Sequence, residues 1–345
     1  MICGVLKKIA WLAAYVLGLA ALVIAGAWVW WQPEPEPAAR GTEVNALWAR
    51  HQWVGEAHTE DEYRAFAGLL RENRITDVYF HAGPFEPDGS VPPAKYRNAG
   101  KLIEAMRKYA PAVRTQAYLG QIRKVDGHGL VDLDDPAVRE RVLKTDAILL
   151  DLGFTGIHYD FEPIYPDDQG FLTLLDQTRA LTRARGRLLS VAIEQLTTVD
   201  ALQPVYEALL PRGWGRTHYP PRPTRDFLVK IADRSDQVAI MTYDVSLPTR
   251  SLVGLHFARH TEQTLRLIGD RTTVFIGVPT YRPMMEWAED LPGALRGVRR
   301  GLDALDRPPA RPYGVGVYAD WTTSPADWAR YRATWLPPGP AKVGG

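Results

Sequence analysis

Hydrophobic and polar positions divide the chain into an apolar N-terminus, a short polar spacer and a long region of alternating patterns. Residues 9–31 carry no charged side chain, and a helix needs roughly 20 apolar residues to cross a bilayer. Lys7 and Lys8 precede this stretch and three tryptophans close it, which favours a cytoplasmic N-terminus. We therefore expect a transmembrane anchor over residues 1–31, with the cell membrane as a partner and the globular domain on the extracytoplasmic side.

A cleaved signal peptide is the alternative interpretation of this N-terminus. Ala25-Gly26-Ala27 is a small-residue pattern that a signal peptidase accepts. The anchor is favoured because the apolar run continues past that pattern, and both interpretations export the domain that follows. Residues 32–41, QPEPEPAARG, predict a stiff and extended linker, so the globular domain should occupy residues 42–345.

The region 42–345 alternates short β-branched or aromatic runs with longer amphipathic segments, which is typical of βα units around a parallel sheet. Eight runs are predicted as strands: 44–49, 76–82, 113–119, 156–162, 188–195, 237–244, 273–280 and 313–319. Predicted helices include 60–73, 99–109, 136–152, 169–185 and 260–268. Pro136 follows two aspartates suited to N-capping, and Gly153 is placed to end the same helix.

This pattern favours an α/β fold, a (β/α)₈ TIM barrel, over an open doubly wound sheet. No G-x-G-x-x-G follows the first run, and neither a P-loop nor an H-E-x-x-H motif is present. The histidines are scattered, so we expect neither a cofactor nor a bound metal. Basic and acidic residues number 41 and 40, which gives no reason to expect nucleic acid as a partner.

The run 156–162 carries the most informative polar residues. Strand alternation places His158, Asp160 and Glu162 on the inward face of a barrel. Asp160 and Glu162 come at the C-terminal end of the strand, where TIM-barrel active sites lie. Two carboxyls in a partly enclosed site raise the pKa of one of them, which keeps an acid available near neutral pH, as glycosidic cleavage requires. The alternative is that they merely begin a surface loop before Pro163.

Three segments resemble signatures of glycoside hydrolase family 18, the chitinase-like TIM-barrel hydrolases. Residues 155–162, TGIHYDFE, resemble the fourth-strand D-G-x-D-x-D-x-E, with Thr155 and His158 in place of its first two aspartates. Residues 237–244 end in M-T-Y-D, similar to the sixth-strand M-x-Y-D, and 276–281 are similar to the seventh-strand G-x-P-x-Y. In the eighth strand, where the family usually has a tryptophan, this chain has Tyr318, and Trp321 follows it.

The resemblance implies a retaining, substrate-assisted glycosidase acting on a polysaccharide that contains N-acetylhexosamine. Glu162 would protonate the glycosidic oxygen, Asp160 would support the acetamido group as it becomes an oxazolinium ion, and Tyr243 would donate a hydrogen bond to that group. His158 removes a carboxyl that would share a proton with Asp160. The residues implied in substrate binding are His158, Met241, Asp244, Tyr281, Tyr318 and Trp321.

Two other functions stay open at this point. The barrel would be a non-catalytic glycan-binding protein at the cell surface if it does not turn over an N-acetyl sugar oligomer. It would be a glycosidase of another clan if cleavage does not depend on the acetamido group of the substrate. In that case Glu194, on the fifth predicted strand, is the best candidate for the nucleophile.

Overall fold

The computed structural model describes residues 36–125, 127–196, 223–245, 247–281 and 287–337, together with Gly18 and Ala21. Contacts group Ala38–Gly345 into one compact unit. Among the described residues, no helix combines the length and the apolar character needed to span a bilayer. The anchor predicted for residues 1–31 lies outside them, except for Gly18 and Ala21, and stays a prediction.

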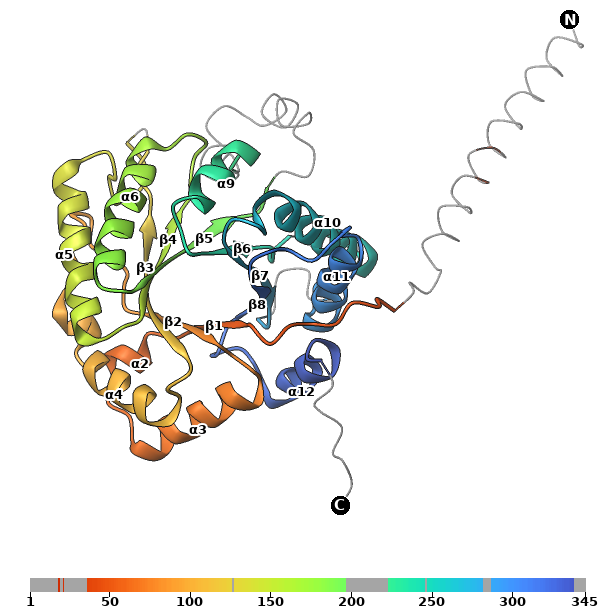
Figure 1. The fold of residues 1–345 in the computed structure, drawn as a ribbon, viewed down its shortest axis with the longest axis horizontal. Helices are drawn as coiled ribbons and strands as arrows, with labels where there is room; N and C mark the ends of the chain where they lie inside the picture. The colour runs from red at the N-terminus through yellow and green to blue at the C-terminus, as the bar shows by residue number, and fades with distance from the viewer. Residues whose placement is uncertain are drawn as a thin grey trace, which may run out of the picture. The chain divides into compact units, whose positions relative to one another are not determined.

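Eight parallel strands close into a barrel in chain order, with β8 hydrogen-bonded to β1 (Figure 1). The strands are β1 (Ala46–Ala49), β2 (Asp77–His81), β3 (Arg114–Ile122), β4 (Gly156–Glu162), β5 (Leu188–Glu194), β6 (Gln237–Met241), β7 (Thr273–Pro279) and β8 (Tyr313–Tyr318). The predicted barrel is therefore confirmed, and β4 has the bounds expected for it. Strand β6 ends three residues before the predicted run does, at Met241.

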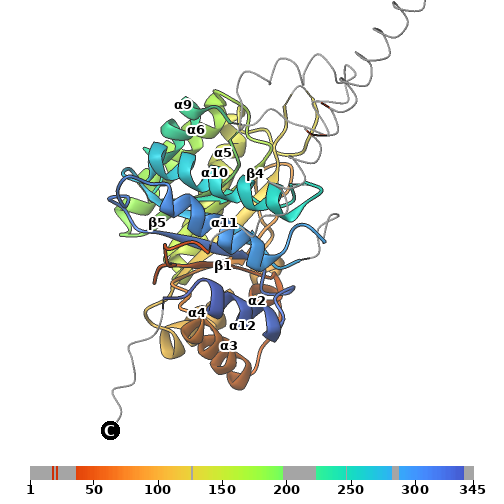
Figure 2. The ribbon, with the colours of Figure 1, turned by 90° about the vertical axis from the view of Figure 1, so that its right-hand side faces the viewer.

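Helices surround the ring of strands in both views (Figures 1 and 2). They are α2 (Gln52–Gly55), α3 (Glu60–Glu72), α4 (Ala99–Tyr109), α5 (Pro136–Leu152), α6 (Gln169–Ala184), α9 (Arg225–Ala232), α10 (Arg250–Ile268), α11 (Leu291–Asp303) and α12 (Pro325–Thr334), with a 3₁₀ turn at Pro93–Tyr96. Helices α4 and α5 have the predicted bounds. The cap signals of α5 are confirmed, because Asp135 accepts the N–H of Ala137 and Gly153 adopts φ 108°. Helix α10 starts ten residues before the predicted 260, where Thr249 caps it.

Side chains fill both the space under the helices and the interior of the barrel. On β4, the outward Ile157, Tyr159 and Phe161 are at most 1% exposed. Inside the ring, Trp48, Tyr79 and Phe275 pack with alanines in a separate buried cluster. The interior is thus a packed core rather than a pore, and a site has room only at the strand ends.

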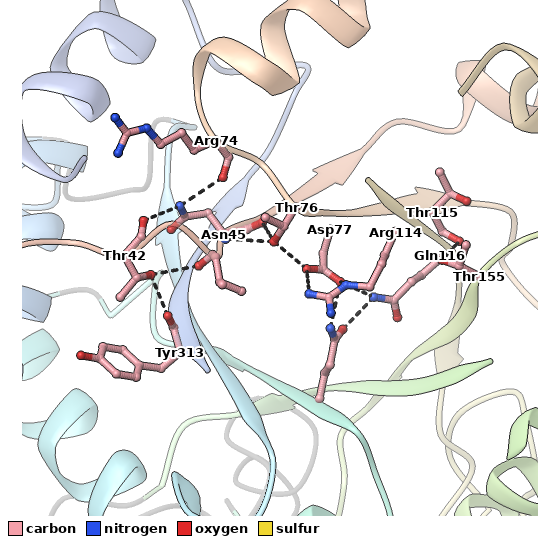
Figure 3. A network of polar contacts seen from close by, with 12 residues as sticks. Thr42, Asn45, Arg74, Thr76, Asp77, Arg114, Thr115, Gln116, Thr155 and Tyr313 are labelled. Atoms are coloured by element: carbon pink, nitrogen blue, oxygen red, sulfur yellow. Dashed lines mark hydrogen bonds and ion pairs between the residues drawn. The ribbon is translucent and has the colours of Figure 1, made fainter. Parts of the chain in front are cut away.

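A polar network occupies the N-terminal ends of the strands (Figure 3). The buried carboxylate of Asp77 accepts hydrogen bonds from Arg114 at 2.8 Å, Gln116 at 3.0 Å and Gln237 at 2.8 Å. Thr76 donates to the same carboxylate at 2.8 Å. A buried charge is tolerated when paired and hydrogen-bonded in this way, so the network belongs to the stability of the barrel. Active sites of TIM barrels lie at the opposite, C-terminal ends of the strands.

Candidate active site

Strand β4 carries a pair of carboxyl groups to the C-terminal end of the barrel. Asp160 and Glu162 are the last two alternate residues of this strand. Asp160 is paired in register with Gly120 of β3. A Cβ atom at Gly120 would lie 2.2 Å from the carbonyl oxygen of Asp160, so the approach of these two strands requires glycine there. The pair therefore stands at the end of the barrel where TIM-barrel active sites are found.

The two oxygen atoms of Asp160 have different surroundings. Its Oδ2 accepts a hydrogen bond from the Tyr118 hydroxyl at 2.6 Å. Its Oδ1 is buried and accepts no hydrogen bond of standard geometry within the described part of the chain. Burial raises the pKa of Asp160, while the interactions with Tyr118 and the Glu162 carboxyl oppose that rise. Asp160 thus has one oxygen held by Tyr118 and lies within interaction distance of the Glu162 carboxyl.

Glu162 is exposed as a residue, and its carboxyl group interacts with the carboxyl groups of Asp160 and Glu194. Burial of this carboxyl is the main cause that raises its pKa well above the usual range. The negative charges of Asp160 and Glu194 raise the pKa further, because they disfavour a third carboxylate beside them. Glu162 is therefore the carboxyl best suited to hold a transferable proton.

Glu194 ends β5 beside this pair. Its Oε1 accepts the backbone N–H of Ile164 at 3.2 Å, which ties Glu194 to the segment that follows β4. The pair predicted from the sequence thus has a third carboxylate as a neighbour, and the effect of its charge on the pKa of Glu162 shows that the groups are close.

Tyrosines form the wall opposite the carboxyl pair. The rings of Tyr243 and Tyr318 stack with centroids 4.9 Å apart, and Tyr281 lies edge-on to both at 5.9 Å. Burial is the main cause that raises the pKa of Tyr243 well above its ordinary value, and the negative charge of Asp160 raises it further. Tyr243 therefore stays a neutral hydroxyl donor beside the pair. Trp321 is 40% exposed and meets Tyr318 edge-on at 5.4 Å.

Two further predicted residues are Met241, the last residue of β6, and Asp244, which follows the strand. Met241 packs against the aromatic cluster inside the barrel. Asp244 is exposed, with φ 59°, and its N–H donates to Glu289 Oε1 at 2.8 Å. The other oxygen of Glu289 accepts the next N–H, that of Val245, at 3.1 Å. Glu289 thus holds the turn that follows Tyr243.

His158, expected to contact substrate, lies instead inside the barrel and is fully buried. Its ring stacks on Tyr79 at 3.6 Å and its Nδ1 lies 2.8 Å from Ser190 Oγ. Burial lowers the pKa of His158 well below its ordinary value, so the imidazole is neutral. The strand parity predicted for His158 is correct, but its depth in the barrel keeps it from a ligand at the mouth.

Tyr118 and Glu289 were not recognised from the sequence. Tyr118 belongs to an alternating strand in which Arg114, Gln116 and Tyr118 share the inward face, so its direction was readable. Its hydrogen-bond partner, Asp160, could not be predicted from the sequence, because a long loop and α5 separate β3 from β4 along the chain. Glu289 gave no local signal, since it precedes α11 as an ordinary acidic residue.

One cavity among the described residues lies beside the mouth, not within it. It measures about 510 Å³ and lies between α3 and α12, where Arg50, Trp53, Asp320 and Trp328 contribute to its lining. It contains neither member of the carboxyl pair. The candidate site therefore rests on the convergence of side chains at the strand ends rather than on cavity size.

No protein-family model and no curated protein matches this sequence. Among solved structures, the chain is similar to the spore cortex-lytic enzyme SleL of Bacillus cereus, with a TM-score of 0.57, 10% identity, and coverage of 88% of this chain and 76% of that one. The SleL enzyme of Bacillus megaterium gives a TM-score of 0.55, 14% identity and the same coverages.

A class V chitinase from Pseudomonas fluorescens also matches, with a TM-score of 0.55 and 14% identity over 84% of this chain and 99% of that one. Identities this low establish the fold alone. The resemblance found in the sequence is thus confirmed at the level of architecture, and the chain has the TIM-barrel fold of chitinase-like enzymes.

Proposed function

We propose that this protein is a glycoside hydrolase that cleaves a polysaccharide containing N-acetylhexosamine, with Glu162 as the acid and base. The observation that carries the proposal is the meeting of Glu162, Asp160 and Tyr243 at the C-terminal end of a closed barrel. The raised pKa of Glu162 supports its role as a proton donor near neutral pH. The fold shared with chitinases and spore cortex-lytic enzymes makes a glycan the natural substrate class.

The mechanism we propose is substrate-assisted and retaining. Glu162 protonates the glycosidic oxygen, and the acetamido carbonyl of the substrate attacks the anomeric carbon as the leaving group departs. The resulting oxazolinium ion is cationic, and Asp160 stabilises it through its negative charge. Tyr243 donates its hydroxyl to the same acetamido group. Glu162 then takes a proton from the water that opens the intermediate.

Substrate contacts beyond the reacting atoms come from the tyrosine wall and its surroundings. Tyr281 and Tyr318 lie beside Tyr243, and the exposed Trp321 offers an apolar face to a sugar ring. Met241 and Asp244 complete the β6 side of the mouth. The burial of His158 argues against a direct contact with substrate, and we propose no such contact.

The test is turnover of N-acetylglucosamine oligomers by the full chain and by two matched variants. Glu162→Gln keeps the shape of the side chain but removes its transferable proton, so kcat should fall by about 10²–10⁴-fold with little change in affinity. Glu194→Gln removes a neighbouring negative charge that raises the pKa of Glu162, so the basic limb of its pH profile should move to lower pH while kcat at the optimum falls far less than in Glu162→Gln. A thiazoline that mimics the cyclised intermediate should inhibit the unmodified protein.

Other outcomes distinguish the alternatives. If Glu194→Gln is as inactive as Glu162→Gln and the thiazoline has no effect, a nucleophilic Glu194 and a two-carboxylate mechanism replace the substrate-assisted one. If the protein binds oligomers but turns none over, it is a glycan-binding barrel. Full activity of Glu162→Gln on a confirmed substrate refutes the assignment of the acid.

We also propose that the barrel is held outside the cell membrane by residues 1–31. Lys7 and Lys8 before the apolar run support this orientation. Protease added to intact cells should release a fragment that starts within or after residues 32–41. Protection of the barrel in intact cells, with digestion only after lysis, contradicts the orientation.

A further inference from the structure

We infer that Tyr118 is a positioning residue that keeps the shared proton of the carboxyl pair on Glu162 by donating its own hydroxyl hydrogen to Asp160. The inference deepens the proposed function and rests on it for its catalytic meaning. The physical claim about Asp160 is testable without any substrate.

The geometry of Tyr118 fits a donor dedicated to Asp160. Both residues face inward from adjacent strands, and the hydroxyl of Tyr118 lies 2.6 Å from Asp160 Oδ2. The phenol is largely enclosed, and both its burial and the nearby charge of Asp160 raise its pKa well above the ordinary value. It therefore keeps its proton at all working pH values, and the hydrogen bond runs from tyrosine to carboxylate.

Ionisable groups lie around the pair at several strand ends. They are His81 on β2, whose ring lies 4.8 Å from that of Tyr118, Tyr118 on β3, His158 on β4, Glu194 on β5, Tyr243 after β6 and Tyr318 on β8. Burial lowers the pKa of both histidines, that of His81 to about 4, so neither supplies a positive charge to the pair near neutral pH. Among these described neighbours, the phenols and Glu194 are the groups that can distinguish one carboxyl from the other.

Glu194 and Tyr118 act on different members of the carboxyl pair. Glu194 acts on Glu162, where its charge favours the protonated form. Tyr118 acts on Asp160, where its hydrogen bond favours the ionised form. Both effects move the single shared proton in the same direction, onto Glu162. Glu162 is thereby protonated and neutral before substrate arrives, and Asp160 is an anion ready for the cationic intermediate.

Tyr118 holds Asp160 from the adjacent strand, because the side chain at position 158, on the same strand as Asp160, has other partners. His158 stands two residues before Asp160 on the same face but engages Ser190 and stacks on Tyr79. It cannot share a proton with Asp160 as a carboxyl would. The orientation of Asp160 is consequently set from the adjacent strand, by Tyr118.

The first experiment measures the pKa of Asp160 directly. The full chain is labelled with ¹³C at the aspartate carboxyl, the Asp160 signal is identified by its loss in Asp160→Asn, and its shift is followed across pH. In Tyr118→Phe, which keeps the ring and removes only the hydroxyl, the pKa of Asp160 should rise by about 1 to 2, as expected for loss of a hydrogen bond to a charged group.

Two companions keep the measurement interpretable. Tyr281→Phe removes a hydroxyl from the same aromatic group that makes no bond to Asp160, and it should leave the Asp160 titration in place. Replacement of Tyr118 by 3-fluorotyrosine strengthens the donor and should lower the pKa of Asp160. An unchanged Asp160 titration in both Tyr118 replacements overturns the inference.

The second experiment separates this inference from the proposed function. If Asp160 must be ionised for turnover, the acid limb of the kcat/KM profile on N-acetylglucosamine oligomers should move to higher pH in Tyr118→Phe by the shift seen in the titration. KM at the plateau should change less than kcat. A shifted titration with an unmoved acid limb upholds the role of Tyr118 and refutes the proposed role of Asp160 in catalysis.

Discussion

A buried carboxyl group lies behind strand β4, between the sheet and helix α5, and it makes the stability of the barrel depend on pH. Asp146 of α5 is fully buried, and the Tyr159 hydroxyl of β4 donates to its Oδ2. The same hydroxyl lies 2.7 Å from Thr178 Oγ1 on α6. Asp146 Oδ1 has no hydrogen-bond partner among the described residues. Burial raises the pKa of Asp146 from 3.8 to about 8, and the bond from Tyr159 only partly opposes this rise.

The sign and size of the effect on stability follow from this shift. Because the folded pKa lies above the unfolded one, the folded chain holds a proton that the unfolded chain has lost between about pH 4 and pH 8. Stability therefore falls as pH rises through this window, by about 1.4 kcal/mol for each pH unit. At pH 7, about three units above the unfolded pKa, the cost is on the order of 4 kcal/mol.

Asp146→Asn removes this titration and keeps an oxygen that accepts the Tyr159 hydroxyl. Its amide hydrogens are buried with few partners, which costs about 1–3 kcal/mol at every pH. We therefore expect the variant to be no more stable than the unmodified protein near pH 4.5 and more stable by about 2–4 kcal/mol at pH 8, where the cost of ionising Asp146 has grown to about 5 kcal/mol. The control is Asp151→Asn, which changes an exposed aspartate of the same helix that pairs with Arg185.

Thermal unfolding followed by circular dichroism at pH 4.5, 6, 7 and 8 tests this prediction. In a barrel of this size, 1 kcal/mol shifts Tm by about 2–4 °C, so the difference between Asp146→Asn and the unmodified protein should grow steadily with pH. Asp151→Asn should show no such growth. A constant difference across this pH range, or a variant that is less stable at pH 8, refutes the reasoning.

Two substitutions test other parts of the barrel. Asp77→Ala should reduce the free energy of unfolding by about 2–3 kcal/mol in urea titrations, below the cost for a fully buried pair because the Arg114 side chain is 39% exposed. Activity per folded molecule should persist, and its loss would mean that the network at the strand N-termini shapes the mouth. Gly277→Ala places a Cβ atom 2.7 Å from the Tyr243 ring, so displacement of Tyr243 should lower kcat by about 10–100-fold. An unchanged kcat with Tyr243 in place in a crystal structure would contradict that expectation.

Local patterns account for the parts of the fold that the sequence predicted well. Strand β4 and helices α4 and α5 have the predicted bounds because alternation, helical periodicity and caps all act within a few residues. Helix α10 was predicted too short because its first turns mix polar and apolar residues, and its Thr249 cap was not recognised. The inward direction of Asp160 and Glu162 was likewise readable from alternation alone.

The sequence by itself thus determined the barrel, the strand that carries the carboxyl pair and the face on which these carboxyls lie, since each is encoded by neighbours along the chain. Only the tertiary structure decided which groups share the mouth. The bond from Tyr118 to Asp160 joins positions 42 residues apart, and the hold of Glu289 on Asp244 spans 45. The depth of each side chain inside the barrel also depends on the tertiary structure. His158 and Glu162 point to the same face of β4, but only the closed ring buries His158 and leaves Glu162 exposed. Burial and the neighbouring charges set the pKa of each carboxyl, and neither exists before the strands close.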